Sequence, residues 1–253
     1  MPRNLISYPT MNSKAGRNLR VLVSLFAYNE GDKLRATLDQ FPVERSYDAL
    51  VVDDGSTDGS LAGVEERGFI LISNSNNEGL GASIRKAFSY ALDNGYDCIV
   101  IMAGNGKDNP NEIGRLLAPI TNDGCDFVQG SRFLKGGAYG NMPFYRLLST
   151  RFVHPFVFST LSGALVTEST NGFRAFRTTI LRDPRIDWKQ RWLDQYELEQ
   201  YVHYKVVTLG YARTEVPVSK IYPKGPGYTK VKAFSGWWSM LKPLVYLAMG
   251  IKE

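Results

Sequence analysis

The fold is decided by two stretches near the start of the chain, LRVLVSLFAYNE (residues 19–30) and DALVVDDGSTDGS (residues 48–60). Each is an apolar run of strand-forming residues that ends in polar residues. A helical pattern spans roughly residues 31–40 between them. A strand, a helix and a second strand in this order predict two parallel strands joined by a crossover, which is the start of a parallel sheet.

The same alternation continues to about residue 133. Apolar runs begin near residues 68, 96 and 125, and helical patterns follow the first two at residues 82–95 and 111–120. On the first of these helices the apolar side chains share one face, and Gly95 is expected to end it. We therefore expect an α/β fold of Rossmann-like type, with a mostly parallel central sheet flanked by helices.

Composition divides the chain into three parts. Residues 1–18 read as a polar, flexible leader, and residues 19–232 form one domain in which the strand–helix alternation fails after about residue 133. Beyond that point a glycine-rich loop precedes a helical pattern at residues 145–166. Residues 233–253 are an aromatic, amphipathic segment that predicts a C-terminal helical extension.

Net charge and hydropathy limit which partners and which cellular location the sequence predicts. The 253 residues carry a formal net charge of +5, which suits an anionic ligand, an anionic membrane surface or nucleic acid. Because no nucleic-acid-binding motif accompanies this basicity, we expect no nucleic-acid partner. The chain has no run of roughly 18 apolar residues and no signal-peptide pattern, and Cys98 and Cys125 lack metal-ligand spacing. We expect a cytoplasmic protein, with peripheral attachment to the inner face of the cell membrane as an alternative.

Polar clusters follow the expected strands at residues 28–30, 53–56, 77–81 and 105–108, and they should converge on one cleft. Asp53 and Asp54 could accept hydrogen bonds from a base or ribose or hold a cation, or they could belong to a turn with a helix cap. The glycines of NEGLGAS, residues 77–83, suit a backbone that approaches phosphate at a helix N-terminus. A dinucleotide fingerprint is weaker there, because its third glycine is absent.

Together these stretches resemble family 2 glycosyltransferases, which have the GT-A fold and transfer sugars from nucleotide donors. The resemblance runs from about Val21 to Lys232, and the branch most similar is the dolichyl- or polyprenyl-phosphate sugar synthases. Phe26 stands where the family has proline. The motifs that carry the resemblance, in the family's order, are FAYNE (26–30), VVDDGSTDGS (51–60), NEGLGASIRKA (77–87), GSRF (130–133), TNGFRAFR (170–177) and EVPVSKIYPKGPGYTK (215–230).

The resemblance implies an inverting transferase that moves a sugar from a nucleotide-sugar donor to a polyprenyl phosphate or a growing surface glycan. Residues 19–133 would be its nucleotide half and residues 134–232 its acceptor half. The phosphates of donor or acceptor would lie near Arg132, Arg146 and Lys230. The implied nucleotide-sugar-binding residues are Ala27, Tyr28, Glu30, Asp53, Asp54, Gly79, Gly81, Arg85, Gly104, Asn105 and Lys107.

The family's Asp-x-Asp, which grips the donor diphosphate through a divalent metal, is replaced here by Ala103-Gly104-Asn105. Three outcomes are open. Asn105 and Asp108 could hold Mg²⁺ or Mn²⁺ instead. Lys107 could supply the counter-charge without a metal. Otherwise catalysis is lost, which leaves a non-catalytic sugar-nucleotide-binding or scaffold protein.

The acceptor decides whether a base is needed. A hydroxyl acceptor needs a general base, whereas a polyprenyl phosphate is already anionic near neutral pH. Glu168, where the family usually has Asp, is the candidate base or acceptor-site carboxylate, and Asp194 is a further catalytic candidate beside Glu197 or Glu199. The segment FSGWWSMLKPLVYLAMGIKE, residues 234–253, could lie at a membrane interface beside a lipid acceptor, or pack on its own core or on a homodimer partner.

Overall fold

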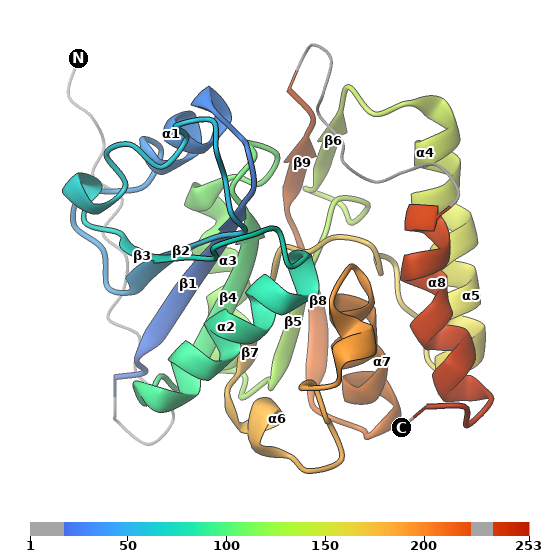
Figure 1. Ribbon diagram of the computed structural model, residues 1–253. Coiled ribbons are helices and arrows are strands. Elements are labelled where there is room, and N and C mark those ends of the chain that lie inside the picture. Colours follow the sequence, from blue (N-terminus) through green and yellow to red (C-terminus); the bar gives the residue numbers. More distant parts are fainter. Residues whose placement is uncertain (1–17, 224–234, 253) are drawn as a thin grey trace.

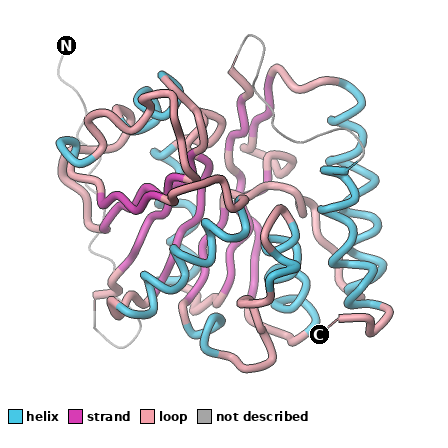
Figure 2. Tube along the Cα trace, in the orientation of Figure 1, coloured by secondary structure: helices cyan, strands magenta, loops and turns pink. Residues whose placement is uncertain are grey.

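The central feature of the computed structural model, which describes residues 18–223 and 235–252, is a seven-stranded sheet with helices on both faces (Figures 1 and 2). The strand order is β3-β2-β1-β4-β7-β5-β8. Only β7 among them runs antiparallel to its neighbours, β4 and β5. The strands are β1 (Val21–Ala27), β2 (Asp48–Asp53), β3 (Ile70–Ser73), β4 (Cys98–Ala103), β5 (Phe127–Ser131), β7 (Arg174–Arg177) and β8 (Arg213–Pro217). The predicted mostly parallel α/β sheet is confirmed.

Helices follow the strands as the sequence pattern predicts. A small second sheet pairs β6 (Ala138–Gly140) with β9 (Ser219–Ile221) in parallel. The α-helices are α1 (Asp32–Leu38), α2 (Leu80–Asp93), α3 (Ile113–Asn122), α4 (Phe144–Leu148), α5 (His154–Ser162), α6 (Thr179–Arg182), α7 (Glu197–Thr208) and α8 (Ser235–Ala248). Short 3₁₀ turns lie at Glu65–Arg67, Pro110–Glu112 and Arg191–Leu193, and a π-helical turn at Ser149–Val153 joins α4 to α5.

The core has one apolar layer on each face of the sheet, because successive side chains of a strand point to opposite faces. Along β1, Val21, Val23 and Leu25 pack toward α1 and α3, whereas Leu22 and Phe26 pack toward α2 and α7. The predicted apolar face of the helix at residues 82–95 belongs to the second layer, and Gly95 follows the helix with a positive φ of 68°. Both layers leave the carboxyl ends of β1, β2 and β4 at one edge of the sheet.

A third apolar cluster lies beside the sheet, where α8 packs on α5 and α7. Leu244 of α8 is fully buried against Phe158 and Tyr204, and Lys242 is paired with Glu197 at 2.8 Å. The C-terminal segment thus packs on this chain's own core, although Trp238 remains half exposed. The leader apart from Asn18, and Lys230, lie outside the described residues. Within the described ranges, no helix combines the length and apolar character needed to cross a bilayer.

Candidate active site

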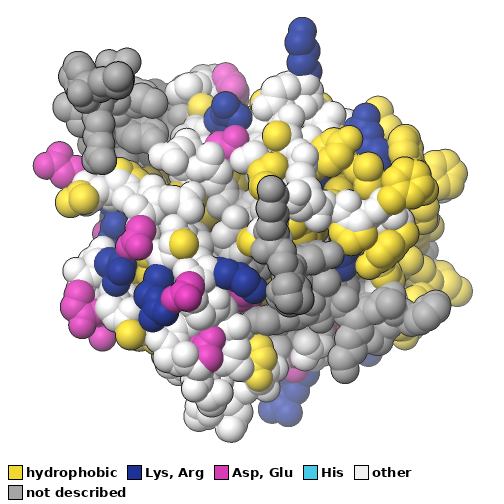
Figure 3. Space-filling model, turned by 90° about the horizontal axis from the view of Figure 1, so that it is seen from above, with side chains coloured by type: hydrophobic (Ala, Val, Ile, Leu, Met, Phe, Trp, Pro, Cys, Tyr) yellow, Lys and Arg dark blue, Asp and Glu magenta, His cyan; other side chains and the backbone are white. Residues whose placement is uncertain are grey.

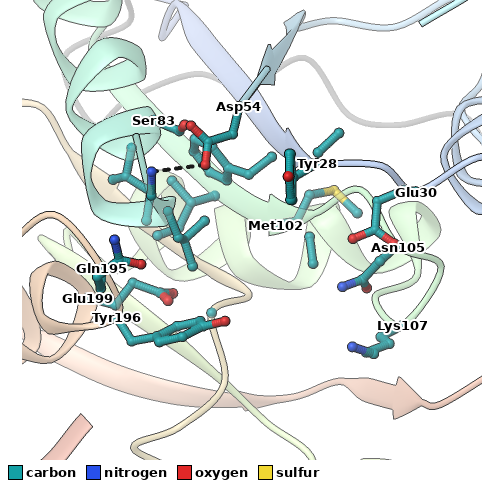
Figure 4. A pocket seen from close by; sticks show the side chains of 18 of the residues that line it. Tyr28, Glu30, Asp54, Ser83, Met102, Asn105, Lys107, Gln195, Tyr196 and Glu199 are labelled. Atoms are coloured by element: carbon teal, nitrogen blue, oxygen red, sulfur yellow. Dashed lines mark hydrogen bonds between the residues drawn. The ribbon is translucent and has the colours of Figure 1, made fainter. Parts of the chain in front are cut away.

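A cavity of about 930 Å³ opens where the loops after β1, β2 and β4 meet the start of α7 and strand β9 (Figure 4). Its position at the carboxyl ends of parallel strands is where open α/β sheets bind ligands. The predicted polar clusters do converge on it. Its walls include Ala27, Tyr28, Glu30, Asp54, Asn77, Gly79, Ser83, Met102, Asn105, Lys107, Arg146, Thr170, Gln195, Tyr196, Glu199, Lys220, Tyr222 and Met240.

Asp54 holds the loop that precedes α2. Its carboxylate accepts hydrogen bonds from the backbone N–H groups of Glu78 (2.9 Å) and Gly79 (3.0 Å), and from the Asn74 amide (2.8 Å). Gly79 has a φ of 101°, and a Cβ there would lie 2.5 Å from the carbonyl oxygen of Asp194. Only glycine fits this position without a shift. Asp54 thereby brings the N-terminus of α2 to the cavity wall.

Asp53 has a different role, although it precedes Asp54 in the same motif. Its buried carboxylate accepts hydrogen bonds from the N–H groups of Gly55 (3.2 Å) and Ser56 (3.1 Å) and from the Ser56 hydroxyl. It does not line the cavity. The turn interpretation therefore describes Asp53, whereas Asp54 faces the site. Asn29 joins this turn to the β1 loop, because its side-chain oxygen accepts from the Thr57 N–H at 2.8 Å.

The loop after β4 carries two polar groups into the cavity, Asn105 and Lys107. Gly104 lies behind them, where its N–H donates to the Phe26 carbonyl at 3.0 Å and the loop packs tightly on β1. The side-chain oxygen of Asn105 is buried and makes no hydrogen bond within the described structure. A buried acceptor without a hydrogen-bond partner destabilises the fold. The Asn105 oxygen is therefore a candidate to accept a hydrogen bond from a ligand.

Three basic side chains line the cavity, Lys107, Arg146 and Lys220. Burial and the nearby Lys220 charge lower the pKa of Lys107 to about 8, against the attraction of Glu30 and Asp108. The Lys107 ammonium lies 5.0 Å, and the Arg146 guanidinium 5.9 Å, from the centre of the Tyr222 ring. This concentration of positive charge suits a polyanionic ligand such as a diphosphate.

The predicted metal ligands do not form a cation site of the expected kind. Asp108 is buried, and its two oxygens accept from Lys220 Nζ (2.6 Å) and the Ala103 N–H (3.0 Å). Asn105 is then the one member of the predicted pair with an oxygen left for a metal. Across the described part of the chain, no three His, Cys, Asp or Glu side chains are grouped to hold a metal ion. Mg²⁺ is commonly held by one or two carboxylates together with substrate phosphates, and the one carboxylate of the predicted pair already accepts from Lys220 and the Ala103 N–H.

Several predicted site residues lie outside the cavity wall of the described structure. Arg132 and Glu168 form a buried ion pair at 2.7 Å, and Glu168 also accepts from the N–H and hydroxyl of Thr170. Arg85 pairs with Asp194 and lies in a separate shallow hollow. Gly81 serves packing, because a Cβ there would lie 1.9 Å from the carbonyl oxygen of Leu193. The ligand-binding and catalytic roles of these residues stay predictions.

Sequence reasoning missed the wall formed by residues 195–200 and β9. Gln195 and Tyr196 lie just before α7, and Lys220 and Tyr222 lie in and after β9. Glu199, one of several acids considered in that region, does line the cavity. Burial raises the pKa of its carboxyl, while Arg174 and Lys220 oppose that shift. The sequence signals for this wall were the polar run at 194–200, which is equally typical of a solvated helix start, and the motif at 215–230, for which no site residue other than Lys230 was predicted.

Comparisons with known proteins agree with this geometry. The family model for glycosyl transferase family 2 matches residues 23–183, more than half of the chain. A polyprenol monophosphomannose synthase of Mycolicibacterium smegmatis is 30% identical over 212 residues, 79% of this chain and 77% of that protein. An undecaprenyl-phosphate mannosyltransferase of Micrococcus luteus is 30% identical over 209 residues, 79% of this chain and 83% of that protein.

Solved structures show the same fold at lower sequence identity. A glucosyl-3-phosphoglycerate synthase of Mycobacterium tuberculosis, in complex with Mn²⁺, UDP and glucosyl-3-phosphoglycerate, superposes with a TM-score of 0.66 at 17% identity. The match covers 96% of this chain and 84% of that protein. The predicted GT-A fold is therefore confirmed. The family match, the two relatives and the cavity at the strand ends together show that the chain belongs to glycosyl transferase family 2 and is a glycosyltransferase.

Proposed function

We propose that the enzyme transfers a hexosyl group from a nucleotide-sugar donor to the phosphate of a polyprenyl phosphate, with inversion at the anomeric carbon. The observation that carries the proposal is one cavity that combines carboxylates suited to a nucleoside with three basic side chains suited to phosphates. Relatives whose names specify polyprenol and undecaprenyl phosphate support the acceptor. A volume of about 930 Å³ is within the range of small-molecule sites.

The donor's nucleoside would lie against the loops after β1 and β2. Asp54 lines this part of the cavity, and a carboxylate accepts hydrogen bonds from base N–H groups and ribose hydroxyls. Tyr28 offers an aromatic ring between Asp54 and Glu30, and Glu30 lies closer to Asn105 (Figure 4). The diphosphate would then extend toward Asn105 and Lys107, which Figure 4 shows on a different side of the cavity from Asp54.

The reaction is a single displacement. An oxygen of the acceptor phosphate forms the new bond to the anomeric carbon as the bond from that carbon to the donor phosphate breaks. The electron pair of the broken bond leaves with the nucleoside diphosphate. No proton has to be removed, because a phosphate monoester is anionic near neutral pH. The buried pairing of Glu168 with Arg132 is compatible with this scheme, in which Glu168 acts as a positioning residue rather than as a base.

The negative charge that develops on the leaving diphosphate needs a counter-charge. The glucosyl-3-phosphoglycerate synthase with the same fold holds Mn²⁺ together with UDP. In this chain Asp108 is paired with Lys220, and each offsets the other's charge, so we assign the counter-charge to Lys107 and Arg146. Of the two solutions that the sequence left open, the contacts support the one without a metal.

Two measurements test the proposed function. Calorimetric titration of a panel of nucleoside diphosphates, with Mn²⁺ and with chelator, should give the same affinity in both conditions for the preferred base. Incubation of the matching nucleotide sugar with a short-chain polyprenyl phosphate should yield a glycosylated lipid phosphate and free nucleoside diphosphate. Normal nucleotide binding with no turnover, with or without metal, would favour the scaffold alternative.

A hydroxyl of a growing glycan is the second candidate acceptor, and Glu199 favours it. This carboxyl lines the cavity, and its raised pKa suits a general base. The Glu199→Gln variant separates the two acceptors. It should keep transfer to polyprenyl phosphate, which needs no base, and lose transfer to a hydroxyl.

A further inference from the structure

A row of large apolar side chains is exposed along the helical run of α4, the π-helical turn and α5. Their exposed fractions range from 41% for Leu148 to 72% for Phe144 and Phe156. Figure 3 shows hydrophobic side chains gathered on this side of the molecule. Contiguous apolar surface of this kind marks an interaction site in a folded protein. We call it the apolar helix face, which consists of Phe144, Tyr145, Leu148, Phe152, Val153 and Phe156.

The helical run is inverted compared with an ordinary surface helix. From residue 144 to residue 154, its exposed positions 144, 148 and 152 are apolar, whereas the buried positions Arg146, Thr150 and His154 are polar; beyond them, α5 also buries the apolar Pro155 and Phe158. On a regular α-helix, residues four apart drift by about 40° at each step. The wider turn at Ser149–Val153 reduces that drift, so the two faces stay distinct along the run. A helix with its apolar side outward fits an apolar partner better than water.

The exposed charges on the segment that carries this face are of one sign. Residues 127–167 contain no Asp or Glu, and the exposed charged side chains among them are Lys135 and Arg151, since Arg132 and Arg146 are buried. The Arg151 guanidinium lies 5.9 Å from the centre of the Phe152 ring. Aromatic and aliphatic side chains flanked by basic ones match the boundary between the acyl chains and headgroups of an anionic bilayer.

The apolar helix face adjoins the cavity. Helix α4 is only five residues long, and it exposes Phe144 and Tyr145 while its Arg146 lines the cavity. Met240 of α8, the helix that packs on α5, lines the same cavity. We infer that the apolar helix face docks the enzyme on an anionic lipid bilayer and so brings a lipid-linked phosphate to the Arg146 side of the cavity. The identity of that lipid rests on the proposed function, whereas the docking does not.

The test is co-sedimentation with vesicles of phosphatidylglycerol and phosphatidylcholine in equal parts, and with vesicles of phosphatidylcholine alone. The wild-type protein should bind the anionic vesicles more tightly, and added salt should weaken that binding. The double variant Phe152→Gln/Phe156→Gln should bind at least about tenfold more weakly, because two large apolar side chains no longer enter the bilayer. Two single variants serve as matched controls, Val43→Gln (98% exposed) and Met249→Gln (69% exposed, at the C-terminal end).

The inference is overturned if the double variant binds like the wild type, or if the wild type does not bind anionic vesicles. A wild-type dimer that the double variant converts to a monomer would also overturn it, since the face would then join two copies. Transfer to a short-chain polyprenyl phosphate in solution is measured alongside and should be equal in both proteins. If vesicles bind while neither protein transfers sugar to this acceptor, the proposed function fails and the docking surface stands.

Discussion

At the scale of single residues, Lys107 carries most of the proposal for how the donor diphosphate is held. The residue lies two positions after Asn105, in the loop where an acidic pair is expected, and it faces the cavity together with Arg146 and Lys220. The loop carries positive charge at this position. In the proposed scheme, a bound diphosphate would relieve the repulsion between Lys107 and Lys220.

The Lys107→Ala variant should bind nucleoside diphosphate about tenfold or more weakly, because a charge-assisted hydrogen bond contributes roughly 1.5–3 kcal/mol. Calorimetric titration in the presence of chelator measures this directly. Lys189→Ala removes an exposed lysine outside the cavity and is the matched control. Equal affinities of the two variants would contradict the assignment of Lys107.

The Gly79→Ala variant should lose both stability and nucleotide affinity. The new Cβ would meet the Asp194 carbonyl oxygen, so the loop held by Asp54 must shift, at a cost of roughly 1–3 kcal/mol. Gly210→Ala is the matched control, because Gly210 also has a positive φ but nothing lies within 4 Å of its added Cβ. Urea unfolding and nucleotide titration check the pair. Gly79→Ala should lose affinity while Gly210→Ala keeps it.

At the scale of elements, α8 has a structural role. Its Leu244 fills the space between α5 and α7, and Lys242 is tied to Glu197 at the start of α7. A truncation of this segment would expose the third apolar cluster, and its effect on membrane binding could not be separated from unfolding. The apolar helix face on α4 and α5 is the better place to test that binding.

The Leu244→Ala variant should lower the free energy of unfolding by about 2–5 kcal/mol, because a fully buried leucine leaves both a transfer cost and a cavity. Met249→Ala, in the exposed part of the same segment, should change it by less than about 0.5 kcal/mol. Urea unfolding followed by circular dichroism measures both. A small effect at Leu244 would mean that α8 does not stabilise the domain.

At the scale of the whole molecule, the chain's two histidines make its stability sensitive to acid. His154 and His203 are both buried, and His203 lies between the rings of Phe127 and Phe158. Burial lowers the pKa of His154 to about 4 and that of His203 well below its ordinary value of 6.5. The unfolded chain therefore binds protons at a higher pH than the folded chain does.

The free energy of unfolding should fall as pH drops below about 6.5, by up to about 1.4 kcal/mol per pH unit for each histidine. The stability that each neutral, buried histidine contributes is fully present above the pKa of the unfolded chain. It is lost as the pH falls toward the lower pKa of the folded chain. The raised pKa of Glu199 makes stability rise as the pH falls, which opposes the effect of the two histidines but comes from a single group. Urea unfolding at several values between about pH 7 and pH 5 checks the slope. The His203→Phe variant should reduce it, and an unchanged slope would contradict this account.

The sequence was sufficient for the features that depend on local pattern. Alternating apolar runs predicted the parallel strands, and polar residues at the strand ends predicted where Asp54, Asn105 and Lys107 would meet. The pairing of Asp108 with Lys220 could not be predicted, because the two residues are 112 positions apart. For the same reason the sequence showed neither that Glu168 is buried against Arg132 nor that α4 turns its polar side inward.

The pairing of Asp108 with Lys220 also has a consequence for engineering. The changes Ala103→Asp and Asn105→Asp would place two new carboxylates in the loop that carries Lys107. Lys220 already pairs with Asp108, so the Lys107 ammonium would be the cation that competes with a metal for the new carboxylates. An engineered metal site in this loop therefore requires that Lys107 change together with the two new aspartates.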